Sequence, residues 1–288
     1  AVTITPEPTM RPPISHFPSR PRSPARFARL VVLSLAALLA ACASKEPAPP
    51  QPPAQPEPPP RIQEAPPATR AQIKQELAAG YYERGQMDVA LEELNEAVKL
   101  DPSNARIFNV YGLVYTTLGE NPKAEENFRR ALTLAPTDSE IRQNWGWFLC
   151  QTGRARESIA EFEAAVRNPL YRTPWIALIN AGKCSAVIGD VTGAQNFYRR
   201  ALTVSPNNPE AAYNFALLQY KAANYGDARA LMRIVMLQNN PPPEALYLGL
   251  CTERKLGDRQ SELSYVAQLR NRWPEAAETK AIVGGSCE

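Results

Sequence analysis

The chain has 288 residues, with 32 lysines and arginines against 29 aspartates and glutamates, a formal net charge of +3. This balance gives no electrostatic case for nucleic-acid binding, which needs a basic face or stripe. The single histidine, His16, lies in an N-terminal segment rich in arginine and proline. Imidazole catalysis and a histidine-ligated metal site are therefore excluded from the folded part.

The first 41 residues have the pattern of an export signal. They contain five arginines and one glutamate, so the basic charge of the chain belongs to this segment. The 12-residue apolar run Leu30–Ala41 follows the arginines. It is shorter than the roughly 20 residues of a membrane-spanning helix, so it fits the hydrophobic region of a secretory signal.

The end of this run, Leu39-Ala40-Ala41-Cys42, resembles a bacterial lipobox, in which the cysteine is diacylated on sulfur and becomes the new N-terminus. We therefore expect a signal peptide over residues 1–41 and lipidation at Cys42. Ala43 is not an aspartate, which by the enterobacterial sorting rule favours the outer membrane. The alternatives are an ordinary signal peptide with a chance cysteine, or an uncleaved anchor.

Residues 42–69 read as a tether. Eleven prolines lie between residues 47 and 67. Proline at this density prevents a helix and favours extended polyproline II, which rises about 3.1 Å per residue. We expect a disordered, proline-rich linker that holds the folded part some tens of ångströms from a membrane; the alternative is a purely passive linker.

From residue 70 the sequence repeats itself at an offset of 34 residues: Ala90, Leu94, Ala97 and Pro102 align with Ala124, Phe128, Ala131 and Pro136. This is the tetratricopeptide pattern, in which each unit is a pair of antiparallel helices and stacked units share one core. Similar units continue to Pro274. We therefore predict an all-α tetratricopeptide-repeat solenoid of about six helix pairs over residues 70–275, followed by a C-terminal tail over residues 276–288.

The repeats leave no room for a catalytic domain. The sequence contains no glycine-rich phosphate loop, no paired-cysteine metal spacing, and no Ser/His or Cys/His set. We predict that the protein is not an enzyme and takes no cofactor, metal or small-molecule substrate.

Several segments are more specific than a generic repeat: Asn144–Gln151 with Gly153, Asn168–Tyr171 with Pro174, Asn180–Gly182 with Cys184, Ala194–Pro206, Leu248–Gly249 with Arg254, and Leu256–Asp258. They resemble the type IV pilus biogenesis lipoproteins of the PilF and PilW type, the pilotins. The resemblance implies an outer-membrane protein facing the periplasm that binds a subunit of the pilus secretin. It further implies support for secretin multimerisation, pilus assembly and twitching motility. The long tether and the tail after Pro274 depart from the family.

A second hypothesis is a generic periplasmic repeat adaptor, for example one that coordinates peptidoglycan enzymes. It has no reason to share the segments around Trp145 and Cys184.

Asparagines recur at similar places in successive first helices. Their amides carry donors and acceptors that can hold a peptide backbone in the groove of a solenoid. The alternative is that they bond neighbouring repeats and stabilise the stack. The expected partner-binding residues in the groove are Asn109, Asn144, Asn180 and Asn214, flanked by Trp147, Lys183, Leu217 and Tyr220.

The first repeat offers a second candidate surface. End repeats usually carry polar outer faces, so apolar residues there suggest a partner site. The alternative is that the tether folds back over them. The residues are Ile73, Leu77, Tyr81, Tyr82, Leu91 and Leu94, of which Leu77 and Tyr81 are the expected contacts.

The cysteines suggest disulfides. If Cys42 is lipidated, four remain, an even number for an oxidising compartment. Cys150 and Cys184 lie in first helices of successive units, so a bridge is feasible if both side chains face the shared seam. Parity alone suggests that Cys251 pairs with Cys287 and ties the tail onto the last repeat. The alternative for both pairs is buried free thiols.

Overall fold

The computed structural model describes residues 64–284 and 287. This part of the chain contains thirteen α-helices and no strand. The predicted all-α tetratricopeptide solenoid is therefore confirmed. The expected signal peptide, Cys42 and nearly all of the tether lie outside the described residues.

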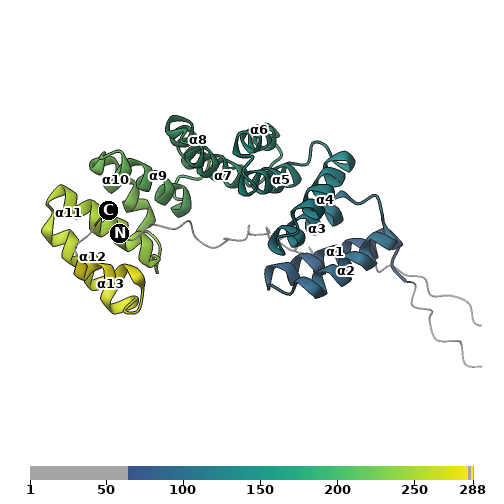
Figure 1. The fold of residues 1–288 in the computed structure, drawn as a ribbon, viewed down its shortest axis with the longest axis horizontal. Coiled ribbons are helices and arrows are strands. Elements are labelled where there is room, and N and C mark those ends of the chain that lie inside the picture. Colours follow the sequence, from purple (N-terminus) through teal and green to yellow (C-terminus); the bar gives the residue numbers. More distant parts are fainter. Residues whose placement is uncertain (1–63, 285–286, 288) are drawn as a thin grey trace, which may run out of the picture. The chain divides into compact units, whose positions relative to one another are not determined.

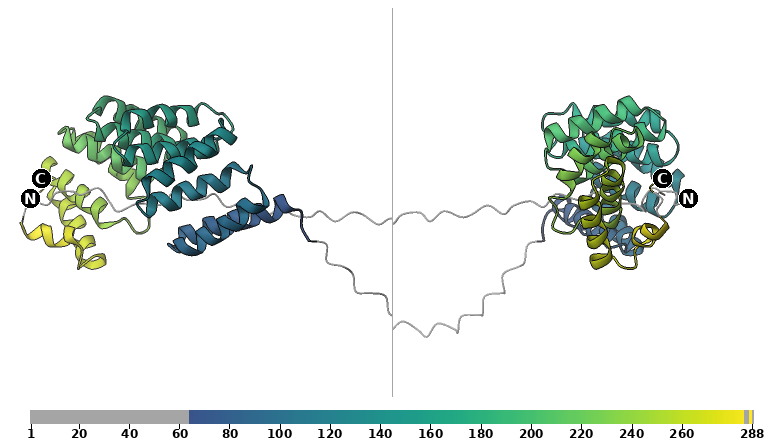
Figure 2. Two further views of the ribbon diagram at one scale, coloured as in Figure 1. Left: turned by 45° about the vertical axis from the view of Figure 1, so that its right-hand side comes forward. Right: turned by 90° about the vertical axis from the view of Figure 1, so that its left-hand side faces the viewer.

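Twelve of the helices form six pairs, which follow one another in chain order (Figures 1 and 2). The first helices are α1 (Pro67–Glu83), α3 (Ala105–Thr117), α5 (Ser139–Gln151), α7 (Pro174–Val187), α9 (Pro209–Lys221) and α11 (Pro243–Leu256). The second helices are α2 (Met87–Leu100), α4 (Asn121–Leu134), α6 (Ala155–Val166), α8 (Val191–Val204), α10 (Tyr225–Val235) and α12 (Arg259–Arg272). None of the helices in the described part is long and apolar enough to cross a membrane.

Short polar side chains begin several first helices. The Asp138 carboxylate accepts the backbone N–H groups of Glu140 at 2.9 Å and Ile141 at 3.1 Å. Asn208 accepts the N–H of Ala211 at 2.9 Å in the same way. These bonds satisfy donors that a helix start leaves without an intrahelical acceptor, which fixes where α5 and α9 begin.

The packing within each pair follows a spacing of sixteen residues. In four pairs a glycine of the first helix faces an aromatic ring of the second helix: Gly112 with Phe128, Gly146 with Phe162, Gly182 with Tyr198, and Gly249 with Tyr265. In the other two pairs an alanine takes the glycine position and an unbranched-ring-free side chain takes the other, Ala78 with Leu94 and Ala216 with Met232. The volume summed over the two positions is thus kept roughly constant, as dense core packing requires.

Successive first helices contact one another, from α1 with α3 to α9 with α11, whereas successive second helices do not. The first helices therefore line the more closely spaced side of the stack, which in a solenoid is the concave side. We call this side the first-helix face.

The chain beyond the sixth pair is not simply a tail. Residues Ala277–Gly284 form helix α13, which packs against α11 and α12. At the other end α1 starts at Pro67, three residues before the predicted start of the repeats, with proline in its first turn. Proline is tolerated there because its missing N–H would have no helical partner.

Candidate partner-binding face and its disulfides

Two of the four aligned asparagines join neighbouring repeats. The side-chain N–H of Asn144 in α5 donates to the side-chain oxygen of Asn109 in α3 at 3.2 Å. Both residues are buried, with 8% and 9% of their surface exposed. The structure therefore favours, for this pair, the alternative in which the amides stabilise the stack rather than hold a partner.

The other two asparagines do not continue this link. The side-chain N–H of Asn214 donates to the carbonyl of Glu210 in its own helix at 2.8 Å. Asn180 is half-buried on α7. The expected ladder of four equivalent amides is therefore wrong, because each repeat places its asparagine in a different environment.

The flanking residues are engaged more than expected. The Lys183 ammonium lies 2.7 Å from the carboxylate of Glu210 and ties α7 to the start of α9. The Tyr220 hydroxyl donates to the backbone carbonyl of Cys287 at 2.8 Å, and burial raises the pKa of this phenol above its ordinary value. Neither side chain is a free flank. Trp147 and Leu217 are half-buried against the core clusters of their own regions.

In the first repeat, the apolar surface is narrower than the sequence suggests. Tyr82 and Leu94 are buried, so they belong to the core and not to a partner site. Ile73 and Leu77 are 49% and 45% exposed. With Tyr81, half-buried beneath the Arg84 guanidinium at 4.7 Å, they form a stripe at four-residue spacing along α1. We call Ile73, Leu77 and Tyr81 the α1 stripe.

Two disulfides cross between elements. Cys150 of α5 is bonded to Cys184 of α7, with 5.9 Å between their Cα atoms. Cys251 of α11 is bonded to Cys287, beyond α13, with 5.4 Å between their Cα atoms. The structure thus pairs the cysteines as their positions suggest, and a bridge fixes the seam between the third and fourth repeats.

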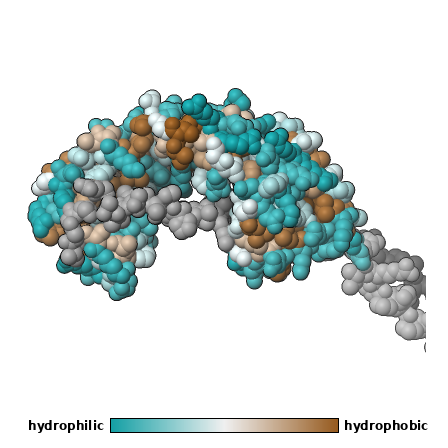
Figure 3. Space-filling model, viewed as in Figure 1, coloured by the Kyte–Doolittle hydropathy of each residue, from teal (hydrophilic) through white to brown (hydrophobic). Residues whose placement is uncertain are grey.

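The remaining surface offers little chemistry. Among the described residues no group of three or more His, Cys, Asp or Glu side chains could hold a metal ion. A shallow polar hollow of about 370 Å³ lies beside α12 and is lined by residues that include Ser261, Tyr265 and Arg272. In the view of Figure 3, hydrophobic residues form small separate patches on a largely hydrophilic surface.

Sequence reasoning missed Glu210 and Arg254. Glu210 pairs with Lys183 across 27 residues, and Arg254 lies 3.4 Å from the sulfur of Cys287 across 33 residues. No local spacing rule covers such contacts between repeats. The one available signal was the charge complementarity of Lys183 and Glu210.

Comparisons with known proteins first give the class. A family model described as "Tetratricopeptide repeat" matches residues 104–239, and a second, described as "TPR repeat", matches residues 80–119. The chain is therefore a tetratricopeptide-repeat scaffold, a fold that serves protein–protein interaction.

Three relatives give the family. The crystal structure of PilW, described as a widely conserved type IV pilus biogenesis factor, is 33% identical with a TM-score of 0.67, and the match covers 74% of this chain and 98% of PilW. The structure of PilF from Pseudomonas aeruginosa is 25% identical with a TM-score of 0.68, covering 76% and 99% of the two chains. In sequence, the type IV pilus assembly protein PilF of the same organism is 27% identical over 203 residues, 70% of this chain and 81% of the relative. The chain belongs to the family of type IV pilus biogenesis proteins with tetratricopeptide repeats.

Proposed function

We propose that this protein is a pilotin: a lipid-anchored, non-enzymatic assembly factor of the outer membrane, facing the periplasm. In this proposal it binds a subunit of the type IV pilus secretin and promotes secretin multimerisation. Pilus assembly and twitching motility depend on that step.

The observation that carries the proposal is the extent of the family match. Nearly the full length of both pilus structures aligns with this chain, 98% of PilW and 99% of PilF. All six helix pairs of this chain are present for a partner to contact. A scaffold that keeps the whole repeat array supports a role in which the array itself binds the partner.

The α1 stripe is the surface that we propose for the secretin subunit. Its leucine and isoleucine are nearly half exposed although they follow the spacing of one helix face. Covering an exposed leucine releases about 1.5–3 kcal/mol, enough to make one side chain matter for affinity. The half-buried Tyr81 gives the same stripe an aromatic rim.

Leu77→Glu tests this surface. Because Leu77 is 45% exposed, the substitution leaves the core intact, and we expect an unchanged melting temperature with secretin binding weakened about tenfold or more. Secretin multimers on gels and twitching zones should fall together in a deletion strain that carries the variant. Leu263→Glu is the matched control, since Leu263 is 50% exposed on α12. Equal effects of the two substitutions would contradict the α1 site, and normal multimers in the deletion strain itself would contradict the pilotin role.

The lipid anchor is tested separately. Replacing Cys42 by alanine removes the sulfur that the lipobox resemblance assigns to the lipid. We expect the variant to leave the outer-membrane fraction for the soluble periplasmic fraction, while its repeat domain unfolds at the same temperature. Labelling with a radioactive fatty acid checks the modification directly, and label retained by the Cys42→Ala variant would disprove it.

A further inference from the structure

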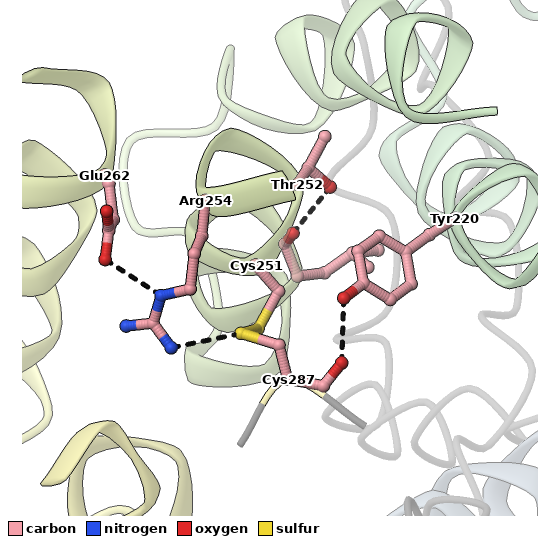
Figure 4. Close-up of a disulfide and its surroundings, with 7 residues drawn as sticks. Tyr220, Cys251, Thr252, Arg254, Glu262 and Cys287 are labelled. Atoms are coloured by element: carbon pink, nitrogen blue, oxygen red, sulfur yellow. Dashed lines mark hydrogen bonds and ion pairs between the residues drawn. A yellow bond between two sulfur atoms is a disulfide. The ribbon is translucent and has the colours of Figure 1, made fainter. Parts of the chain in front are cut away.

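The end of the chain lies on a first-helix seam of the last two repeats. Cys287 is bonded to Cys251 of α11, and its backbone carbonyl accepts the hydroxyl of Tyr220 in α9. The Arg254 guanidinium lies 3.4 Å from the Cys287 sulfur and is itself held by Glu262 at 2.9 Å. Figure 4 shows Cys287 between Arg254 on one side and Tyr220 on the other.

The surface beneath Cys287 combines aromatic rings with polar donors. The rings of Tyr220 and Tyr225 lie 5.3 Å apart, and Tyr247 belongs to the same cluster as Tyr220. Their hydroxyls can donate to backbone carbonyls, as Tyr220 does to Cys287. We call Tyr220, Tyr247, Cys251 and Arg254 the distal seam.

We propose that the distal seam is a binding site for an extended peptide segment of a partner protein, and that the Cys251–Cys287 disulfide keeps the seam filled by the chain's own end. The contact of Tyr220 with the carbonyl of Cys287 is the model for the backbone contact that the partner makes. The inference does not depend on the identity of the partner or on the secretin proposal.

The disulfide is the strongest bond that holds Cys287 on the seam. The neutral hydrogen bond from Tyr220 contributes about 1 kcal/mol, which does not fix a chain end by itself. Cys150 and Cys184 differ, because α5 and α7 stay packed whether or not their sulfurs are bonded. Opening one bridge uncovers a surface, whereas opening the other does not.

A dithiol reductant opens the seam by thiol–disulfide exchange. One of its thiolates attacks a sulfur of the Cys251–Cys287 bond and forms a mixed disulfide, while the other cysteine leaves as a thiolate. The second thiol of the reductant then displaces the remaining cysteine. The reductant is oxidised to its disulfide by two electrons, and both cysteines end as thiols after protonation.

The first arm of the test measures exposure of Tyr220 by hydroxyl-radical footprinting of the full chain. Cys287→Ser cannot form the bridge, and we expect the oxidation rate of Tyr220 to rise at least threefold, with Tyr81 as the unchanged internal reference. The matched control removes the other bridge by Cys150→Ala and Cys184→Ala, and it should leave the Tyr220 rate as in the wild type. An unchanged Tyr220 rate in Cys287→Ser would overturn the proposal.

The second arm asks whether the open seam recognises a peptide strand. The probe is a synthetic copy of residues 281–288 whose cysteine carries an activated disulfide, and the free thiol of Cys251 in the Cys287→Ser chain attacks it. We expect capture at least tenfold faster than that of an equally activated free cysteine. Tyr220→Phe keeps the ring and removes the hydroxyl, so it should lower this advantage about fivefold, the factor for one neutral hydrogen bond. Equal rates for peptide and free cysteine, or no effect of Tyr220→Phe, would overturn the proposal.

Discussion

At the scale of single residues, Gly182 shows how tightly each helix pair is closed. A Cβ atom at this position would lie 2.5 Å from the Cε1 atom of the Tyr198 ring. Tyr198 is 2% exposed, so its ring has no free space into which it could move. The glycine is therefore required by the neighbouring helix, although glycine lowers the stability of a helix interior.

We predict that Gly182→Ala lowers the free energy of unfolding by about 1–3 kcal/mol, the usual cost of overpacking a core. Chemical denaturation of the purified repeat protein measures this difference. Gly226→Ala is the control, because a Cβ there meets no atom within 4 Å and alanine is the better helix former. A Gly182→Ala variant as stable as Gly226→Ala would show that α7 and α8 can separate at little cost.

At the scale of helices, ion pairs link elements whose backbones do not touch. Arg200 of α8 binds both carboxylate oxygens of Glu163 in α6, at 2.6 and 3.1 Å. The hydrogen bond from Arg200 lowers the pKa of Glu163 below its ordinary value of 4.5. Because the pKa is lower in the folded state, the pair stabilises the fold above the ordinary pKa, and this contribution is lost as the pH falls through the folded value.

We predict that Glu163→Gln lowers the free energy of unfolding at pH 7 by a few tenths to about 1 kcal/mol, since both side chains are 36% exposed and solvent screens the pair. The difference from the wild type should shrink towards pH 3 and in 1 M salt. Denaturation curves at several pH values provide the measurement. Glu126→Gln, at an exposed second-helix position, is the control and should show no such pH dependence. A constant difference at all pH values would assign the effect to packing.

At the scale of the whole molecule, the Cys150–Cys184 bridge joins the two halves of the repeat array. It connects residues 34 positions apart and lies between the third and fourth repeats. A cross-link of this span restricts the unfolded chain, and the chain-entropy model gives roughly 3–4 kcal/mol of stabilisation.

We predict that replacing both Cys150 and Cys184 by alanine lowers the free energy of unfolding by up to that amount and leaves the helix content unchanged. Circular dichroism and urea denaturation of the double variant measure both quantities. Reduction of the wild type should add no larger loss than the double variant plus the Cys287→Ser variant. A double variant with wild-type stability would mean that the packing of α5 on α7 alone fixes the seam.

The sequence alone determined the helix pairs and the cysteine partners that corresponding helices bring together. Gly182 and Tyr198, or Gly112 and Phe128, lie sixteen residues apart, and this spacing is set by the geometry of one helix pair. Periodicity can be read from the chain because each such contact lies within a single repeat.

Contacts between different repeats were decided by the tertiary structure. Asn109 meets Asn144, Lys183 meets Glu210, and Tyr220 meets Cys287 across 35, 27 and 67 residues. The same periodicity placed four asparagines at similar positions, yet only the rotation of one pair against the next decides which side chains touch. The tail contact depends in addition on α13, which returns the chain end to α9 and α11 and has no repeat signature in the sequence.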